Sequence, residues 1–222
     1  MKKILYHGSQ NIIEAPIFGY GKRDNDYGLG FYCTESIELA KEWSVSEDRD
    51  GFANEYQIDL TGLKILNLND GKYCALYWLA ILIENRRFPI NGPLAFDAIE
   101  YLKKHYSLNY RDYDIIIGYR ADDGYFLFAS DFLNGTISYQ QLITAMHLGN
   151  LGEQVVLISE KAFERIKFVR AIKASSIDYY SNKVYRDQLA LNSYYKIQRN
   201  KGDLYISQII DEEIKPDDKR LR

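Results

Sequence analysis

Hydrophobic positions along the chain follow two different spacings, and the change between them predicts where strands and helices lie. Tyr56, Ile58 and Leu60 alternate with polar residues, which is the pattern of a strand with one buried face. The longest apolar run, Cys74–Ile83, is too short to cross a bilayer as a helix and is typical of a helix buried in a core. The same reasoning predicts strands at residues 3–7, 31–32, 56–60, 114–118, 154–158 and 168–172. It predicts helices at 73–86, 94–105, 138–147, 160–166 and 184–198, and a further helix whose N-terminus Thr34 caps.

These elements follow one another without a regular strand–helix–strand repeat, which favours an α+β fold over a doubly wound parallel sheet. The amino-acid composition changes after Ala174, where the chain becomes rich in Ser, Asn, Tyr and Lys. We therefore expect one domain over residues 1–174 and a helical appendage over 175–222 that takes no part in the functional site. The charged end, Asp217–Arg222, is expected to fray.

Composition limits the classes of function. A net charge of −3 argues against non-specific binding to nucleic acid, which needs a cationic surface. Cys33 and Cys74 lack metal-ligand spacing and the three histidines are dispersed, so we expect reduced thiols and no metal site. Lys2 and Lys3 are followed by only a short apolar stretch, which does not make a signal peptide. We expect a cytoplasmic protein that does not bind a membrane.

Two short motifs near the N-terminus carry the candidate chemistry. Leu5–Ser9 is typical of a strand that ends at His7. In Asp26–Thr34, two glycines give a flexible turn that leads into a strand bearing Tyr32. A histidine and a tyrosine on neighbouring strands can form two walls of a narrow slot, which suits a flat ring attached to a sugar. Taken alone, His7 fits better a histidine that merely closes a strand; Gly8 and the second motif together favour a functional role. The glycines of the second motif precede the strand, so this is no dinucleotide-binding fingerprint of the Rossmann type.

Together with Trp43, these motifs resemble the first two motifs of ADP-ribosyltransferases of the diphtheria-toxin and poly(ADP-ribose) polymerase type. The closest likeness is to a bacterial domain-of-unknown-function family assigned to that superfamily. Asp114–Asp123 and Leu151–Val156 fit the same family, so the likeness covers residues 3–172. It implies a split, twisted β-sheet with flanking helices around a cleft for NAD, which is the substrate.

The resemblance also implies roles for individual residues. His7 would bind ribose hydroxyls, and Gly8, which has no Cβ, would offer its backbone to the nicotinamide carboxamide. Tyr32 would form one side of the nicotinamide slot and Trp43 a second stacking ring for the cationic pyridinium, although Trp43 also suits ordinary core packing. The full set expected to bind NAD is His7, Gly8, Ser9, Tyr32, Thr34 and Trp43.

The third motif departs from the family pattern. Active members usually place a glutamate on a strand, and the matching strand here begins Glu153-Gln154, whose side chains point to opposite faces. The alignment favours Gln154 as the third catalytic residue beside His7 and Tyr32; a register shift of one would give that role to Glu153. Glutamine can orient the ribose but brings no charge, and losing one electrostatic partner costs on the order of 3 kcal/mol. We expect Gln154→Glu to be milder than Gln154→Ala. Auxiliary carboxylates could come from Asp122 and Asp123, which also suit a solvated turn.

The resemblance implies transfer of ADP-ribose from NAD to a macromolecule, either protein or nucleic acid, with hydrolysis of NAD as a side activity. Bacterial proteins of this type often act as toxins in toxin–antitoxin or phage-defence loci, so an antitoxin is an expected partner. The alternative is a module of the same fold that binds NAD or a protein without transferring ADP-ribose. The uncharged Gln154 favours a module that binds NAD, and the twenty tyrosines favour a module that binds a protein.

Overall fold

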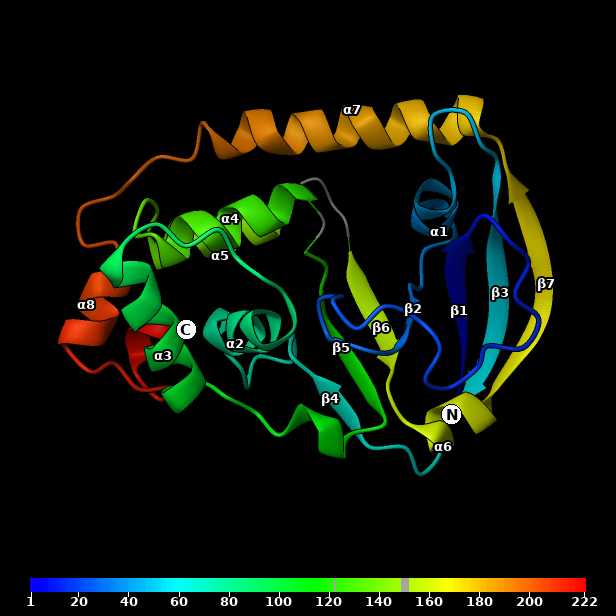
Figure 1. Ribbon diagram of the computed structural model, residues 1–222, viewed down its shortest axis with the longest axis horizontal. Helices are drawn as coiled ribbons and strands as arrows, with labels where there is room; N and C mark the ends of the chain where they lie inside the picture. Colours follow the sequence, from blue (N-terminus) through cyan, green and yellow to red (C-terminus); the bar gives the residue numbers. More distant parts are fainter. Residues whose placement is uncertain (122, 149–151) are drawn as a thin grey trace.

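The computed structural model describes residues 1–121, 123–148 and 152–222, with the side chains of residues 123–125 outside that description. Its strands form two sheets, which confirms an α+β fold (Figure 1). The first sheet is antiparallel and has the order β1 (Lys2–Ser9), β3 (Gly51–Asp59), β7 (Ile166–Ala174). The second has the order β2 (Phe31–Cys33), β6 (Glu153–Leu157), β5 (Ile115–Tyr119), β4 (Ile65–Asn67), in which only β4 and β5 run parallel.

Helices cover one face of the second sheet, and α1 (Ile37–Ser44) packs against the first sheet. The other helices are α2 (Ala75–Asn85), α3 (Pro93–His105), α4 (Asp123–Leu133), α5 (Tyr139–Met146), α6 (Glu160–Arg165), α7 (Ser176–Tyr194) and α8 (Ile206–Asp211), with short 3-10 turns at Tyr110–Asp112 and Lys219–Leu221. The sequence predicted most of the strands and helices but missed β4, α4 and α8. It also placed the start of α7 too late. Within the described residues, no helix combines the length and the apolar character needed to cross a membrane.

Capping explains where two of the helices begin. The predicted capping box of α5 is present, because the Ser138 hydroxyl accepts from Gln141 N at 3.1 Å and the Gln141 side chain accepts from Ser138 N at 3.0 Å. The expectation that Thr34 caps α1 is wrong, since Ser36 takes that position. The backbone of Thr34 instead exchanges two hydrogen bonds with Tyr6, of 2.8 and 2.9 Å, and this bridge joins the two sheets.

Two buried clusters hold the layers together. The smaller one lies between the sheets and contains Leu5 and Tyr56 from the first sheet and Val155 and Leu157 from the second. The larger one packs α2, α3, α4 and α5 against the other face of the second sheet, where Val156 lies. Because β6 is covered on both faces, its apolar residues run consecutively instead of alternating.

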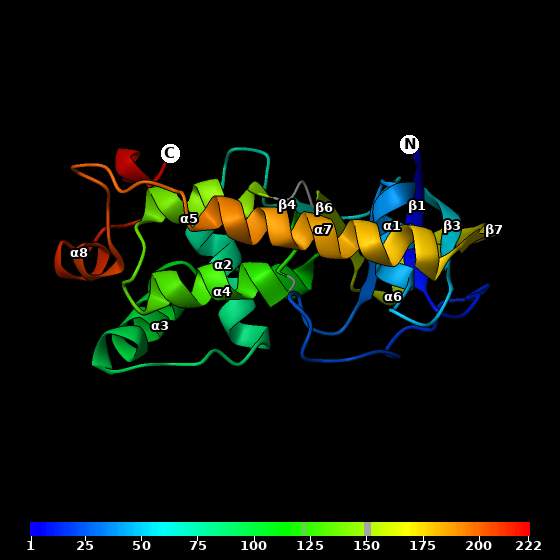
Figure 2. The same ribbon diagram turned by 90° about the horizontal axis from the view of Figure 1, so that it is seen from above.

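The C-terminal segment packs on both halves of the molecule. In Figures 1 and 2, α7 runs along one side, from the end of β7 past α1 to the helices around α4. Residues beyond α7, including Leu204, Ile209 and Leu221, belong to the larger buried cluster. Arg220 pairs with Glu212 at 2.6 Å beside the buried Leu221. Contrary to the prediction of a frayed end, this segment is packed, because the buried Ile214 and Leu221 anchor it in the larger cluster.

Candidate functional site

A cavity of about 660 Å³ opens where β1 and β2 separate beyond the Tyr6–Thr34 bridge. The cavity walls come from β1, β2 and β6, from α1, α4, α7 and the end of α2, and from the loop before β2 and the segment after β5. The structure brings together on this cavity five residues that the sequence singled out: His7, Gly8, Tyr32, Trp43 and Gln154. Three of them, His7, Tyr32 and Gln154, come from three different strands.

His7 is held in a defined orientation and protonation state. Its Nδ1 lies 2.7 Å from the backbone oxygen of Tyr32, and because a carbonyl only accepts, Nδ1 carries the proton and donates. The imidazole stacks on Phe31, with ring centroids 4.4 Å apart. Burial lowers the pKa of His7 below its usual value, so the ring is neutral at pH 7 and its Nε2 is an acceptor.

Tyr32 contributes the face of its ring rather than its hydroxyl. The hydroxyl donates to the oxygen of Gly28 at 2.6 Å and accepts from the nitrogen of Tyr27 at 3.1 Å. Burial raises the pKa of Tyr32, so the phenol remains protonated. These bonds anchor the loop before β2 and hold the ring against the cavity.

Gly8 and Trp43 meet where α1 crosses β1. A Cβ at Gly8 would lie 2.1 Å from the Ala40 oxygen and 2.9 Å from the Trp43 Cβ, so the close approach of the helix itself requires glycine. The Arg120 guanidinium lies over the Trp43 ring, 4.3 Å from its centroid, so one face of the indole already has a cation on it. The Trp43 Nε1 is buried without a hydrogen-bond partner among the described residues.

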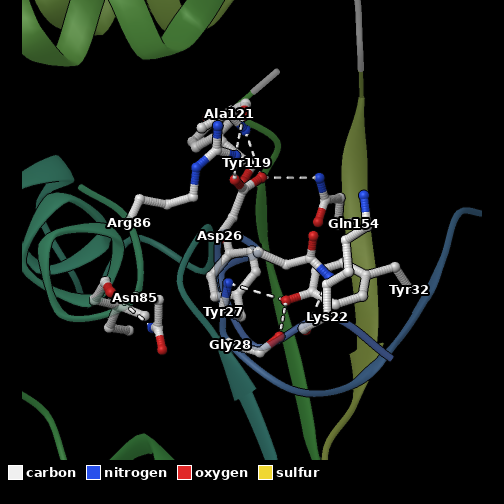
Figure 3. A network of polar contacts seen from close by, with 12 residues as sticks. Lys22, Asp26, Tyr27, Gly28, Tyr32, Asn85, Arg86, Tyr119, Ala121 and Gln154 are labelled. Atoms are coloured by element: carbon white, nitrogen blue, oxygen red, sulfur yellow. Dashed lines mark hydrogen bonds and ion pairs between the residues drawn. The ribbon is translucent and has the colours of Figure 1, made fainter. Parts of the chain in front are cut away.

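Gln154 lies beside a carboxylate that the sequence did not assign to the site, Asp26 (Figure 3). The Asp26 carboxylate accepts from the Arg86 guanidinium at 2.8 Å, from the Ala121 backbone nitrogen at 2.8 Å and from the Gln154 amide at 3.2 Å. Desolvation raises the pKa of Asp26, opposed by the Ala121 N–H and the charge of Arg86. Among the described residues, the Gln154 Oε1 has no partner although it is buried.

Three further predicted residues, Ser9, Thr34 and Glu153, lie outside the cavity lining. Ser9 caps the adjacent turn by accepting from Asn11 N, and Thr34 is buried at the bridge between the sheets. Glu153 is on the opposite face of β6, where it accepts from Asn69 at 2.8 Å, as strand alternation predicted. Asp122 lies outside the described residues, and so does the side chain of Asp123, which begins α4.

Several cavity residues had no signal in the sequence. Among the described lining residues the charged ones are Lys22, Asp26, Arg86, Arg120, Lys183 and Asp187, of which four are cationic. Arg86 follows a buried helix and Lys183 lies on α7, so neither belongs to a motif. Two of the charged residues had a weak signal: Asp26 opens the second motif, and Arg120 lies within the Asp114–Asp123 segment that fits the family.

The structure corrects the expectation that residues 175–222 take no part in the site. Lys183, Asp187, Ala190 and Leu191 of α7 line the cavity. The helix is held on α1 by an ion pair between Arg186 and Glu42 and by a hydrogen bond of 2.8 Å from Lys41 to the Tyr179 hydroxyl. The final segment therefore supplies one wall of the cavity.

Comparison with known proteins gives one result. A family model described as "Protein of unknown function (DUF3990)" matches residues 3–168, a span that contains β1, β2 and β6 and ends before α7. No curated protein and no solved structure matches the chain.

Proposed function

Because this chain belongs to the DUF3990 family of proteins of unknown function, we propose its function from the cavity: it binds NAD there and transfers ADP-ribose to a macromolecule. The observation that carries the proposal is the meeting of His7, Tyr32 and Gln154 on one cavity. They occur in the order in which ADP-ribosyltransferases use their three motifs, and they come from separate strands of two sheets. Chance placement of a histidine, a tyrosine and a glutamine would not favour one shared cavity.

The cavity has properties that suit NAD. Its volume of about 660 Å³ falls within the range of roughly 300–1,000 Å³ that is usual for small-molecule sites. The excess of cationic side chains in its lining suits the diphosphate, although the whole chain is acidic. The Gln154 Oε1 and the Trp43 Nε1 have no partner among the described residues, and a ligand with hydroxyl and amide groups would satisfy such atoms.

The chemistry follows from these groups. The bond between the nicotinamide nitrogen and the ribose C1′ breaks, nicotinamide leaves with the electron pair, and the ribose gains oxocarbenium character. An acceptor nucleophile then forms a bond to C1′ and loses its proton; water as acceptor gives hydrolysis. His7 Nε2 would accept from a ribose hydroxyl, the Tyr32 ring would cover the nicotinamide, and Gln154 would accept a hydrogen bond from the ribose.

The second candidate function is a module that binds NAD without transferring ADP-ribose. It is motivated by Gln154, which stands where active family members place a charged glutamate. The resemblance also supports a role as a toxin with an antitoxin partner. Binding and nicotinamide release distinguish the two candidates, because only the enzyme releases nicotinamide.

The test measures NAD affinity by calorimetry and nicotinamide release for the full chain and for His7→Ala and Tyr32→Ala. We expect both variants to lose at least tenfold in NAD affinity or turnover, in the range for losing one positioned group. His105→Ala and Tyr195→Ala are matched controls, because neither residue lines the cavity. No NAD binding by the unaltered protein would refute the proposed function. Equal affinity in all variants, with folding verified by thermal melts, would refute the site.

A further inference from the structure

The strongest observation that the roles of the three motifs do not explain is the contact between Asp26 and Gln154. The two residues are 128 positions apart, and both border the cavity. Asp26 is 5 % exposed and Gln154 is 5 % exposed, so water does not compete for this hydrogen bond. A carboxylate accepts and never donates while it is ionised. It therefore selects the NH₂ edge of the Gln154 amide and turns the carbonyl edge away from itself.

We propose that Asp26 is a positioning residue for Gln154: it holds the amide so that the carbonyl oxygen is the group available to the ribose. This inference rests on the proposed function of the cavity. It implies that Gln154 presents an acceptor oxygen, as a glutamate would, while the negative charge is carried by the residue behind it. The unpartnered state of the Gln154 Oε1 among the described residues fits that assignment.

Asp26 is itself fixed from two sides. Its Oδ1 accepts from Arg86 at the end of α2, and its Oδ2 accepts from both the Ala121 nitrogen and the Gln154 amide. Asparagine has one carbonyl oxygen, so it cannot accept on both sides at once. Asp26→Asn must set its NH₂ group against Arg86 or against Ala121 and Gln154. In the first case the side chain loses the ion pair with Arg86 that fixes it, and in the second it loses the acceptor for the Gln154 amide; either change weakens the hold on Gln154.

The arrangement also changes what a glutamate at position 154 would do. Gln154→Glu would place two carboxylates at about the distance of the present hydrogen bond, 3.2 Å. Two carboxylates that share a site hold one proton between them, and the pair releases this proton at a raised pKa. The positive charges of nearby Arg86 and Arg120 oppose this rise in pKa. While the proton is shared, the variant keeps the geometry of the glutamine; once it is lost, repulsion drives the side chains apart.

The experiment compares four proteins: the unaltered chain, Asp26→Asn, Gln154→Glu and the double variant. Asp114→Asn is the matched control, because Asp114 is also buried, accepts from a backbone nitrogen and pairs with a lysine, but does not line the cavity. We expect Asp26→Asn to lower kcat for nicotinamide release by about tenfold to a hundredfold, the range for an orienting partner. We expect its KM for NAD to change by less than about threefold, and Asp114→Asn to leave both constants near those of the unaltered chain.

Gln154→Glu adds a readout without NAD. In the ligand-free protein its melting temperature, relative to the unaltered chain, should fall as pH rises from 5 to 8. The reason is that the folded state holds the shared proton to higher pH than the unfolded chain does. The double variant has one carboxylate at the pair and should not show this slope. An Asp26→Asn protein that matches Asp114→Asn in kcat, or identical slopes in Gln154→Glu and the double variant, would overturn the inference. Failure of the unaltered chain to bind NAD would instead refute the proposed function.

Discussion

Replacement of Gly8 by alanine tests whether α1 determines this residue. The added Cβ would lie 2.1 Å from the Ala40 oxygen and 2.9 Å from the Trp43 Cβ, where ordinary contacts are 3.4 Å or more. Both atoms belong to the helix backbone or its first side-chain atom, so no rotamer change relieves the overlap. α1 has to move away from β1, and overpacking of this kind costs about 3 kcal/mol of unfolding free energy. Trp43 would move with the helix and change the cavity wall.

The assay is thermal unfolding followed by circular dichroism. A loss of about 3 kcal/mol lowers the melting temperature of a chain of this length by roughly 6–12 °C. Gly62→Ala is the control: Gly62 has φ of +74° and nothing within 4 Å, so alanine there meets only the left-handed strain of about 1 kcal/mol. If Gly8→Ala melts at or above the temperature of Gly62→Ala, the close packing of α1 on β1 is refuted. Loss of NAD affinity without loss of stability would show that Gly8 is required by the ligand alone.

Two further predictions concern His7 and α7. Burial lowers the pKa of His7, so the folded protein binds its proton less readily than the unfolded chain, and stability is lost as pH falls below about 6.5. His7→Asn, whose amide can still donate to the Tyr32 oxygen, should remove this part of the decline in melting temperature between pH 8 and 5; an unchanged profile would refute the assignment. Tyr194→Ala should cost about 3–5 kcal/mol in urea unfolding, because the ring is buried against Phe128. Tyr195→Ala, at a side chain 75 % exposed, should cost less than about 0.5 kcal/mol, and equal losses would contradict the packing of α7.

Local pattern determined much of the fold. Alternation predicted the second half of β3, short apolar stretches predicted β1, β2, β5 and β6, and the Ser138–Gln141 spacing predicted α5, because periodicity and capping act within a few residues. The same local rule placed Gln154 and Glu153 on opposite faces of β6, which the structure confirms. The start of α7 was predicted too late because polar residues occur on both faces of this helix, so its hydrophobic periodicity is weak.

Tertiary structure alone decided how these pieces form the cavity. Asp26 reaches Gln154, and Arg86 reaches Asp26, through contacts between segments far apart in the chain, and no spacing rule encodes such pairs. Gly8 is glycine because α1 crosses it, and α7 lines the cavity because Arg186 and its neighbours dock on α1. The sequence by itself determined which side chains each strand end presents. The packing of helices on two sheets determined which of them share one cavity, because burial of apolar surface sets the relative position of whole elements.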